Sequence, residues 1–210
     1  MRASDYIQVN SEMRVHAPVE AVFLLCCPVE EYKWIPGWKC DLVHCPNERV
    51  ERGTVFDEYS SAPFLMGKAW GKTTWTAVLH EPEQHRVHYA LKNAASDSLY
   101  KIELIDDRSD GTLARLDFRY SAIGPLGLKV IRNRGEAKIK LMLQILMMLL
   151  EHYCERGEMA SSGRIARLIA TSDALDTADR IRLFLNSLAM MRKRDSFKQR
   201  YMKELAAGLR

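Results

Sequence analysis

The stretch GPLGLKVIRNRGEAKIKLMLQILMMLLEHYCERG, residues 124–157, decides how the rest of the chain must fold. Gly124-Pro125 ends the segment before it, and no further proline follows within the stretch. Its apolar residues recur at the spacing of one helical face, at Leu128, Ile131, Ile139, Met142, Leu146, Leu149 and Tyr153. The spacing predicts one long helix over residues 124–157.

The two halves of this predicted helix differ in polarity. A second apolar line runs through Leu141, Ile145 and Met148, so the second half needs cover on more than one side. The first half is cationic, with Lys129, Arg132 and other charged residues around a glycine. The apolar run is too short and too interrupted to span a bilayer, which requires roughly 20 mostly apolar residues. Another part of the chain must therefore wrap around the helix.

Composition is typical of a globular protein, because 47% of the 210 residues are hydrophobic and 28% are charged. The first thirty or so residues lack the cationic start and apolar core of a signal peptide, and we expect none. The five cysteines form no CxxC pair and are odd in number. We therefore expect reduced thiols and a cytoplasmic location.

The net charge of +4 is unevenly distributed along the chain. Residues 161–210 contain 11 Lys and Arg against 5 Asp and Glu, a local charge of +6, which leaves −2 for the remainder. The basic character therefore belongs to the C-terminal tail. The main part of the chain offers no charge argument for nucleic acid, and we expect no nucleic-acid partner.

Upstream of residue 124 the pattern changes from helical to strand-like. Residues 6–16 alternate apolar and polar side chains and predict a first strand. Pro18 opens a short helix, and a second short helix runs through Trp34 to the stop at Pro36-Gly37. Six further strands are predicted, near residues 40–45, 53–59, 68–80, 85–91, 99–105 and 113–122. The fold class is α+β, an antiparallel sheet wrapped around a long C-terminal helix, with a helical C-terminal extension.

Alternation assigns the faces of these strands. In the last one, Phe118 and Tyr120 share a side, while Asp117 and Arg119 point the other way. The same alternation predicts an aromatic set that faces the long helix, made of Trp75, Tyr89, Tyr100, Phe118 and Tyr120. A shift of one residue in strand register would reverse these faces.

Several motifs accompany this order of elements. They are Val15-x-Ala17-Pro18-Val19-Glu20-Ala21-Val22-Phe23, Trp34-x3-Trp38, Thr74-Trp75-Thr76 with Glu81-Pro82, and Tyr120-Ser121-Ala122-Ile123-Gly124. With them the chain resembles the helix-grip, START-like (SRPBCC) superfamily, which includes polyketide cyclases, aromatases, pollen-allergen proteins and lipid-transfer domains. The resemblance covers roughly residues 6–157, and fold alone does not settle function.

The resemblance implies a cavity between sheet and helix that holds a hydrophobic or aromatic small molecule, such as a lipid or a polyketide. The residues expected to bind it are Trp34, Trp38, Phe64, Trp75, Tyr89, Tyr100, Phe118, Tyr120, Arg132 and Met142. Trp34, Trp38 and Phe64 would form the mouth of the cavity or plug the end of the sheet. Arg132 would bind an anionic group or belong to a solvated helix face.

The alternative is an enzyme of the cyclase, aromatase or dehydratase kind that uses the same cavity. Its acid–base candidates are Tyr89, Tyr100 and Tyr120 with Arg132, because no inward His, Asp or Glu is evident, and the catalytic residues remain unknown. Cys40 and His44 share a strand face but lie about 13 Å apart at 3.3 Å per residue, too far for one zinc ion. We predict no metal and no organic cofactor.

The C-terminal part lies beyond the resemblance. We predict a START-like domain at residues 1–158 and a helical extension at 159–210, with a hinge at Ser161-Ser162-Gly163 and helices over 177–191 and 196–209. The extension would pack on the line of Leu141, Ile145 and Met148. Otherwise its basic, amphipathic helices would contact a partner, a second copy of the chain or an anionic membrane surface.

Overall fold

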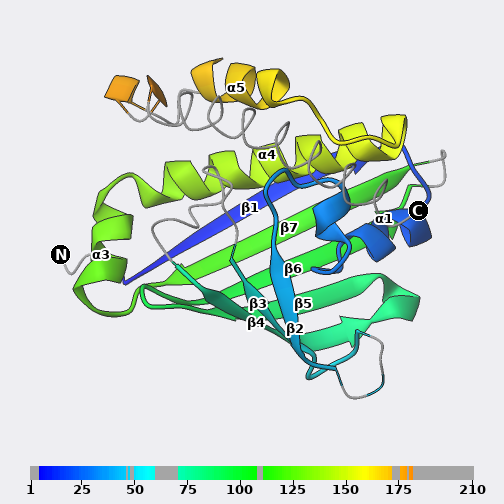
Figure 1. The fold of residues 1–210 in the computed structure, drawn as a ribbon, viewed down its shortest axis with the longest axis horizontal. Helices are drawn as coiled ribbons and strands as arrows, with labels where there is room; N and C mark the ends of the chain where they lie inside the picture. Colours follow the sequence, from blue (N-terminus) through cyan, green and yellow to red (C-terminus); the bar gives the residue numbers. More distant parts are fainter. Residues whose placement is uncertain are drawn as a thin grey trace, which may run out of the picture.

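A computed structural model describes residues 5–45, 47, 50–59, 71–107, 111–171, 176–178 and 180–181 of the chain. Its main feature is a seven-stranded antiparallel sheet with a long helix across one face (Figure 1). The strand order is β1-β7-β6-β5-β4-β3-β2, so every neighbour except the β1–β7 pair is consecutive in sequence. The predicted fold class is thus confirmed.

The strands agree with the sequence prediction to within a few residues. They are β1 (Tyr6–Val15), β2 (Cys40–His44), β3 (Val55–Glu58), β4 (Thr73–Glu81), β5 (Arg86–Lys92), β6 (Asp97–Asp106) and β7 (Thr112–Ser121). The largest difference is at β4, which was expected to include residues 71 and 72. Gly71 has a positive φ of 66°, which a strand does not allow, so β4 begins only at Thr73.

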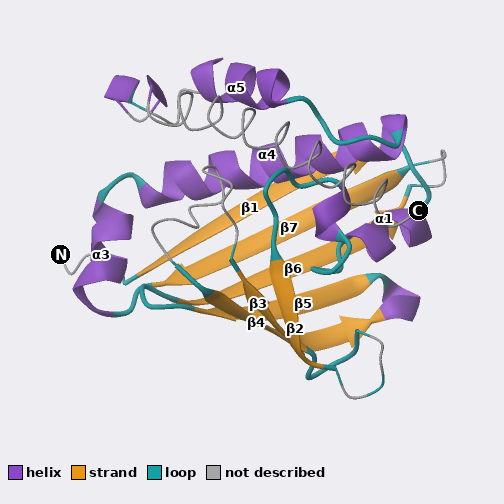
Figure 2. Ribbon diagram, in the orientation of Figure 1, coloured by secondary structure: helices purple, strands orange, loops and turns teal. Residues whose placement is uncertain are grey.

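The helices lie on one side of the sheet (Figure 2). They are α1 (Val19–Leu25), a 3-10 helix (Glu31–Lys33), α3 (Gly124–Arg132), α4 (Gly135–Arg156) and α5 (Ser162–Thr171), with a second 3-10 helix (Pro82–Gln84) in the β4–β5 turn. α4 runs along the sheet and contacts β1, and α1 contacts both β6 and α4. These contacts place α1 beside the space between the sheet and α4.

The predicted single helix over residues 124–157 is wrong, because the structure has two helices with a break at Asn133-Arg134. Arg134 has a left-handed backbone with φ 58°, which ends the hydrogen-bond ladder of α3. A Cβ atom at Gly135 would lie 2.6 Å from the Val130 carbonyl oxygen and 2.9 Å from Ile7 Cδ1. The glycine therefore permits a close approach between α3, β1 and the start of α4, and the chain turns there.

α4 is buried on two sides, as its two apolar lines predict. Ile139, Leu143, Ile145 and Leu149 are fully buried. Near the C-terminal end of α4, Nδ1 of His152 lies 3.0 Å from Arg164 of α5. Figure 1 shows α5 beyond α4 on the side away from the sheet, and the sequence expectation of cover on a second side of α4 is met by α5.

The hinge predicted at Ser161-Ser162-Gly163 is wrong, because α5 begins at Ser162. The Ser161 carbonyl oxygen accepts hydrogen bonds from the amides of Arg164 and Ile165 at 3.0 and 3.5 Å, so Ser161 occupies the residue before the helix, where serine is favoured. Ile165 and Ile169 of α5 are fully buried. This packing fixes the segment against the domain rather than leaving it as a joint.

The predicted helix over 196–209 and most of that over 177–191 lie outside the described residues. The described part of the second agrees with a helical start, since the amide of Arg180 donates to the Asp176 carbonyl oxygen at 2.9 Å. The boundary of the extension at residue 159 stays a prediction. Among the described helices, none is long and apolar enough to cross a bilayer.

Gly127 and Gly163 provide a matched test of this packing. A methyl group at Gly127 in α3 would collide with the Ala95 carbonyl oxygen and lie 2.9 Å from Ala122 Cα, whereas one at Gly163 in α5 would meet only Ser161 Oγ, at 3.9 Å. We expect Gly127→Ala to lower the free energy of unfolding by about 1–3 kcal/mol through overpacking. Gly163→Ala should raise it by roughly 0.5–1 kcal/mol through helix propensity. Urea unfolding measures both, and equal shifts of the same sign would contradict the described packing of α3.

Candidate functional site

A continuous row of aromatic side chains crosses the inner face of the sheet. The register places Phe118 opposite Tyr100, Tyr100 opposite Tyr89, and Tyr89 opposite Ala77. All three aromatic side chains are buried. Trp75 contacts Tyr89 and Tyr100 edge to face, with ring centroids 5.4 and 6.1 Å apart. The predicted inward direction of Trp75, Tyr89, Tyr100, Phe118 and Tyr120 is confirmed.

Trp34 and Trp38 are fixed by hydrogen bonds to the chain that precedes them. The indole Nε1 of Trp34 donates to the Leu25 carbonyl oxygen at 2.9 Å, and that of Trp38 donates to the Pro28 carbonyl oxygen at 2.7 Å. Both side chains are buried, and the Trp38 ring stands edge to face on Trp75 at 5.8 Å. These bonds tie the segment between α1 and β2 to the aromatic row.

Two neighbouring cavities lie between α4, the sheet and the 3-10 helix at Glu31–Lys33. We call the first the β7 cavity, lined by Trp34, Cys26, Ala114 and Leu150 among others, and the second the β4 cavity, lined by Trp38, Glu58, Trp75, Phe118 and Met142 among others. Glu31, Tyr100 and Leu146 line both. These three side chains therefore form the partition between the two spaces.

The cavities are narrow. They enclose about 370 and 430 Å³ of empty space when the solvent at their mouths is counted. Their inner space holds on the order of one or two water molecules each. A ligand larger than a few atoms must therefore displace side chains of the partition, and Leu146, which is only half-buried, is the least constrained of them.

Six of the ten predicted binding residues line these cavities. They are Trp34, Trp38, Trp75, Tyr100, Phe118 and Met142. Phe64 lies outside the described residues. The remaining three, Tyr89, Tyr120 and Arg132, line neither cavity.

Tyr89 and Tyr120 act as structural ties. The Tyr89 hydroxyl donates to the Cys26 carbonyl oxygen at 3.4 Å, and the Tyr120 hydroxyl lies 3.2 Å from the Ala95 and 3.4 Å from the Gly127 carbonyl oxygens. Burial raises the pKa of Tyr120 to about 12 and that of Tyr89 well above its ordinary value. Both phenols therefore stay protonated at neutral pH and cannot serve as bases.

Arg132 lies away from both cavities. Its side chain is exposed at the end of α3, and its Nε donates to the Leu128 carbonyl oxygen of the same helix at 3.3 Å. The break after α3 separates it from the cavity-lining part of α4. The arrangement matches the solvated helix face that was the alternative interpretation of this residue.

The sequence prediction that no acid points inward is wrong, because two glutamates line the β4 cavity. Glu31 is only 5% exposed and Glu58 only 8%. Oε2 of Glu58 accepts a hydrogen bond from Trp75 Nε1 at 2.9 Å. Oε2 of Glu31 has no hydrogen-bond partner among the described residues. Each buried polar group without a partner costs about 1–3 kcal/mol, so Glu31 needs an explanation.

The environment of Glu31 favours its neutral form. Burial raises the pKa of the Glu31 carboxyl well above its ordinary value, and the nearby charge of Glu58 raises it further. Tyr100 shares both cavities with Glu31, and burial likewise raises the pKa of its hydroxyl. The partition thus presents to the two spaces a carboxyl and a phenol whose protonated forms are both favoured by burial.

Weak signals in the sequence indicated both glutamates. Glu31 precedes the apolar Trp34 and Ile35 by three and four residues, and the Ile35 amide donates to the Glu31 carbonyl oxygen at 2.8 Å, so the three share one helical turn. Glu58 alternates with Phe56 on β3 and therefore shares its inner face. Neither signal outweighs the general rule that glutamate is exposed.

Burial favours the thiol form of four of the five cysteines. All five are free; Cys26 Sγ donates to the Val22 carbonyl oxygen at 3.4 Å, and Cys40 Sγ to that of Pro28 at 3.2 Å. Burial raises the pKa of Cys27, Cys40 and Cys154 to about 11, and that of Cys26 further. A nucleophile or metal ligand must be a thiolate, which these values disfavour at neutral pH.

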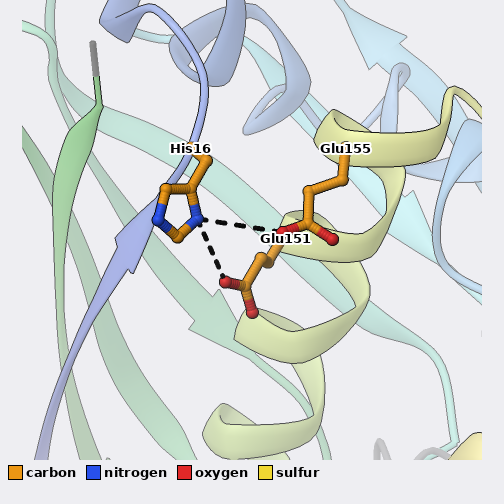
Figure 3. Close-up of side chains that lie close together, drawn as sticks. All are labelled: His16, Glu151 and Glu155. Carbon is orange, nitrogen blue, oxygen red and sulfur yellow. Dashed lines mark ion pairs between the residues drawn. The ribbon is translucent and has the colours of Figure 1, made fainter.

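One group among the described residues has metal-ligand spacing. His16 faces Glu151 and Glu155, which are one turn apart on α4, with Nδ1–Oε1 distances of 3.6 and 3.8 Å (Figure 3). All three side chains are at least partly exposed. Exposed acidic groups of this kind are common without a metal ion, and surface contacts of this type contribute little to stability.

Comparison with known proteins shows which solved structures share this fold. No model of a known protein family matches the chain, and no curated protein matches it in sequence. Several solved structures do match the chain in fold. CalU16 from Micromonospora echinospora matches with a TM-score of 0.51 and 16% identity, over 77% of this chain and 80% of that one. TTHA0849 from Thermus thermophilus matches with a TM-score of 0.54 and 18% identity, over 72% of this chain and 99% of that one.

A START superfamily protein from Mycobacterium smegmatis matches with a TM-score of 0.54 and 18% identity, over 71% of this chain and 97% of that one. These identities are too low to transfer a function. The likeness, over 71–77% of this chain, shows a shared fold. The chain therefore has the helix-grip fold of the START-like (SRPBCC) superfamily.

The unpartnered carboxyl predicts an unusual dependence of stability on pH. The pKa of Glu31 is raised in the folded state, so the folded chain keeps a proton that the unfolded chain releases above the ordinary pKa of 4.5. The free energy of unfolding therefore falls as pH rises through the window between 4.5 and the raised pKa of folded Glu31. Glu31→Gln cannot ionise, so its free energy of unfolding does not fall for this reason. We expect it to unfold with a free energy about 1–3 kcal/mol higher than the wild type at the upper end of the window, and with a smaller difference near pH 4.5.

Glu30→Gln is the matched control, since Glu30 pairs with Lys33 at the surface. Its difference from the wild type should not grow with pH in this window. Denaturant unfolding across the pH series measures all three proteins. Parallel curves for wild type and Glu31→Gln would contradict the described environment of Glu31.

Proposed function

We propose that the chain binds a hydrophobic or aromatic small molecule between the sheet and α4. The observation that carries this proposal is the pair of cavities with apolar walls and a few polar groups, Glu31, Tyr100 and Glu58, which is the composition of a small-molecule site. The START-like fold supports it by analogy only. The ligand enters by displacing the partition, and the aromatic row provides most of its contact surface.

Leu146 provides a direct test, because it lines both cavities from α4. Leu146→Trp fills the partition, and we expect it to weaken binding of the neutral probe 2-naphthalenemethanol at least about tenfold, as several buried contacts are lost. Isothermal titration calorimetry measures the affinity, and circular dichroism verifies folding.

Leu126→Trp is the matched control, because Leu126 is exposed on α3 and lines neither cavity. It should bind like the wild type. Native mass spectrometry of the protein purified from its own cell would also detect the natural ligand, as extra mass that is lost when the protein is denatured. Equal affinities of the two Trp variants, or a wild type that binds no apolar probe at all, would contradict the proposed site.

The two inward carboxyls favour a second candidate function. A neutral Glu31 beside the charge of Glu58 gives a cyclase- or dehydratase-like enzyme a proton donor and a base in one cavity. Such an enzyme should speed the loss of one water from a synthetic poly-β-ketone thioester, and Glu31→Gln should slow that step about 100-fold or more. Mass spectrometry of the products over time measures the rate of water loss. An unchanged rate in Glu31→Gln excludes this role.

A third candidate, an interaction protein that acts through the basic C-terminal helices, depends mainly on residues outside those described. Within the described part, α5 packs on α4 with Ile165 and Ile169 buried. This packing supports a structural role for the start of the extension. Membrane-surface and homo-oligomer contacts of the remainder stay predictions.

A further inference from the structure

The linings of the two cavities have an unbalanced charge. Their ionisable members are Glu31, Glu58, Tyr100 and Cys26, and no basic residue lines either cavity among the described residues. Glu58 accepts the Trp75 indole N–H, and its charge acts on Glu31. A carboxylate entering this space would meet like charge at short range in an apolar environment, which is strongly unfavourable.

Of the described residues that line the cavities, Glu31 is the one with a buried polar atom that has no hydrogen-bond partner. It is nineteen-twentieths buried, its Oε2 has no partner among the described residues, and it lines both cavities. The Tyr100 side chain lines both cavities at the same partition. A group placed at this partition therefore gains a contact with Glu31 that the free protein lacks.

The chemical complement of these groups is a basic nitrogen. An ammonium offers up to three N–H donors and a positive charge, so it can bond an ionised Glu31 and be attracted by Glu58 at once. The surrounding walls suit the rest of such a ligand, since Trp38, Trp75 and Phe118 present aromatic carbon that also attracts cations. A neutral carbonyl could only accept one hydrogen bond from the protonated Glu31 carboxyl and would not be attracted by the charge of Glu58.

We propose that the ligand of this cavity is an apolar molecule with a basic amine, whose nitrogen binds at the partition against Glu31 within the field of Glu58. The inference rests on the proposed binding function and names the class of ligand. It predicts a selectivity order of amine over alcohol over carboxylate for molecules of the same shape.

Binding must be accompanied by a proton movement. At a pH where the Glu31 carboxyl of the free protein is neutral, entry of an ammonium breaks the O–H bond of Glu31; the Glu31 proton leaves to solvent, and the ammonium keeps its own protons. If the neutral amine enters, it takes the Glu31 proton instead. Either way the bound pair is carboxylate and ammonium, and at a pH where the free amine is protonated one proton is released per ligand.

This release makes affinity depend on pH. The groups that interact electrostatically with Glu31 are Glu58 from β3, Tyr89 and Tyr100 from β5 and β6, Cys40 from β2, and Cys26 and Cys27 after α1. The phenols and thiols stay neutral at the pH of the experiment, because burial raises the pKa of each. Affinity for the ammonium should therefore rise with pH while Glu31 loses its proton in the free protein, and level off above that range.

The test uses three naphthalene probes of one shape with the full chain. They are 2-naphthalenemethylamine, 2-naphthalenemethanol and 2-naphthoate, titrated calorimetrically between about pH 5.5 and pH 7.5 in two buffers of different ionisation enthalpy. We expect the amine to bind at least about tenfold tighter than the alcohol at the higher pH, with proton release and with affinity rising with pH. The naphthoate should bind more weakly than the alcohol.

Variants of the chain test whether the preference for the amine over the alcohol depends on Glu31. Glu31→Gln should lose the proton release and the rise with pH and weaken the amine about tenfold, while its affinity for the alcohol stays within about twofold. Glu30→Gln, at the neighbouring surface position, should behave like the wild type. A folded Glu31→Gln protein is expected, since the substitution removes a buried acid without changing its size.

The outcomes separate this inference from the proposed function. If the alcohol or the carboxylate binds as tightly as the amine, the proposed function stands and amine selectivity is wrong. Amine preference that persists with its pH dependence in Glu31→Gln also overturns the assignment to Glu31. If none of the three probes binds the wild type, the proposed function fails, and the inference fails with it.

Discussion

The structure depends on one constraint, the exclusion of water from a helix that has apolar residues on two sides. α4 buries Ile139, Leu143, Ile145 and Leu149 completely. No single layer can cover such a helix, so the sheet takes one side and α5 takes the opposite side. Burying each of these side chains contributes roughly 1.5–3 kcal/mol, which makes this core the main stabilising element of the chain.

The same packing explains the position of the cavities. Aromatic side chains on β4–β7 occupy much of the space under α4, but large rigid rings set edge to face or tilted leave the two cavities between them. α1 and the 3-10 helix cover the open end, anchored by the indoles of Trp34 and Trp38. This anchor carries Glu31 into the interior, where its Oε2 has no hydrogen-bond partner among the described residues. A stable core can tolerate that cost, and the proposed ligand chemistry gives a reason for it.

Sequence periodicity predicted the parts of the fold where many residues repeat one pattern. β5, β6 and β7 are long enough for alternation to place Tyr89, Tyr100 and Phe118 on the inner face, and this was confirmed. The spacing of two apolar lines likewise predicted a second layer over α4. These patterns are strong because each is decided by burial, the largest favourable contribution to folding.

Short elements and breaks within elements were predicted less well from the sequence. The 3-10 helix that holds Glu31 has three residues and β3 has four, so neither shows a period that would reveal an inward acid. The break at Arg134 follows from a close contact between Gly135 and Ile7, which are distant in sequence. That break removed Arg132 from the expected site. Tyr89 and Tyr120 faced inward as predicted, but their hydroxyls bond to backbone oxygens that only the folded chain brings near.

Glu31 is a buried carboxyl that lines both cavities, has no partner for its Oε2 among the described residues, and is shifted toward its protonated form by burial. The most direct measurement is a pH titration of the glutamate side-chain carboxyl ¹³C resonances by NMR, with the Glu31 signal assigned by its absence in Glu31→Gln. We predict that this resonance titrates well above the ordinary glutamate pKa of 4.5, and that it shifts to the ionised position when 2-naphthalenemethylamine is added. A Glu31 carboxyl that titrates at or below the ordinary value would contradict the claim.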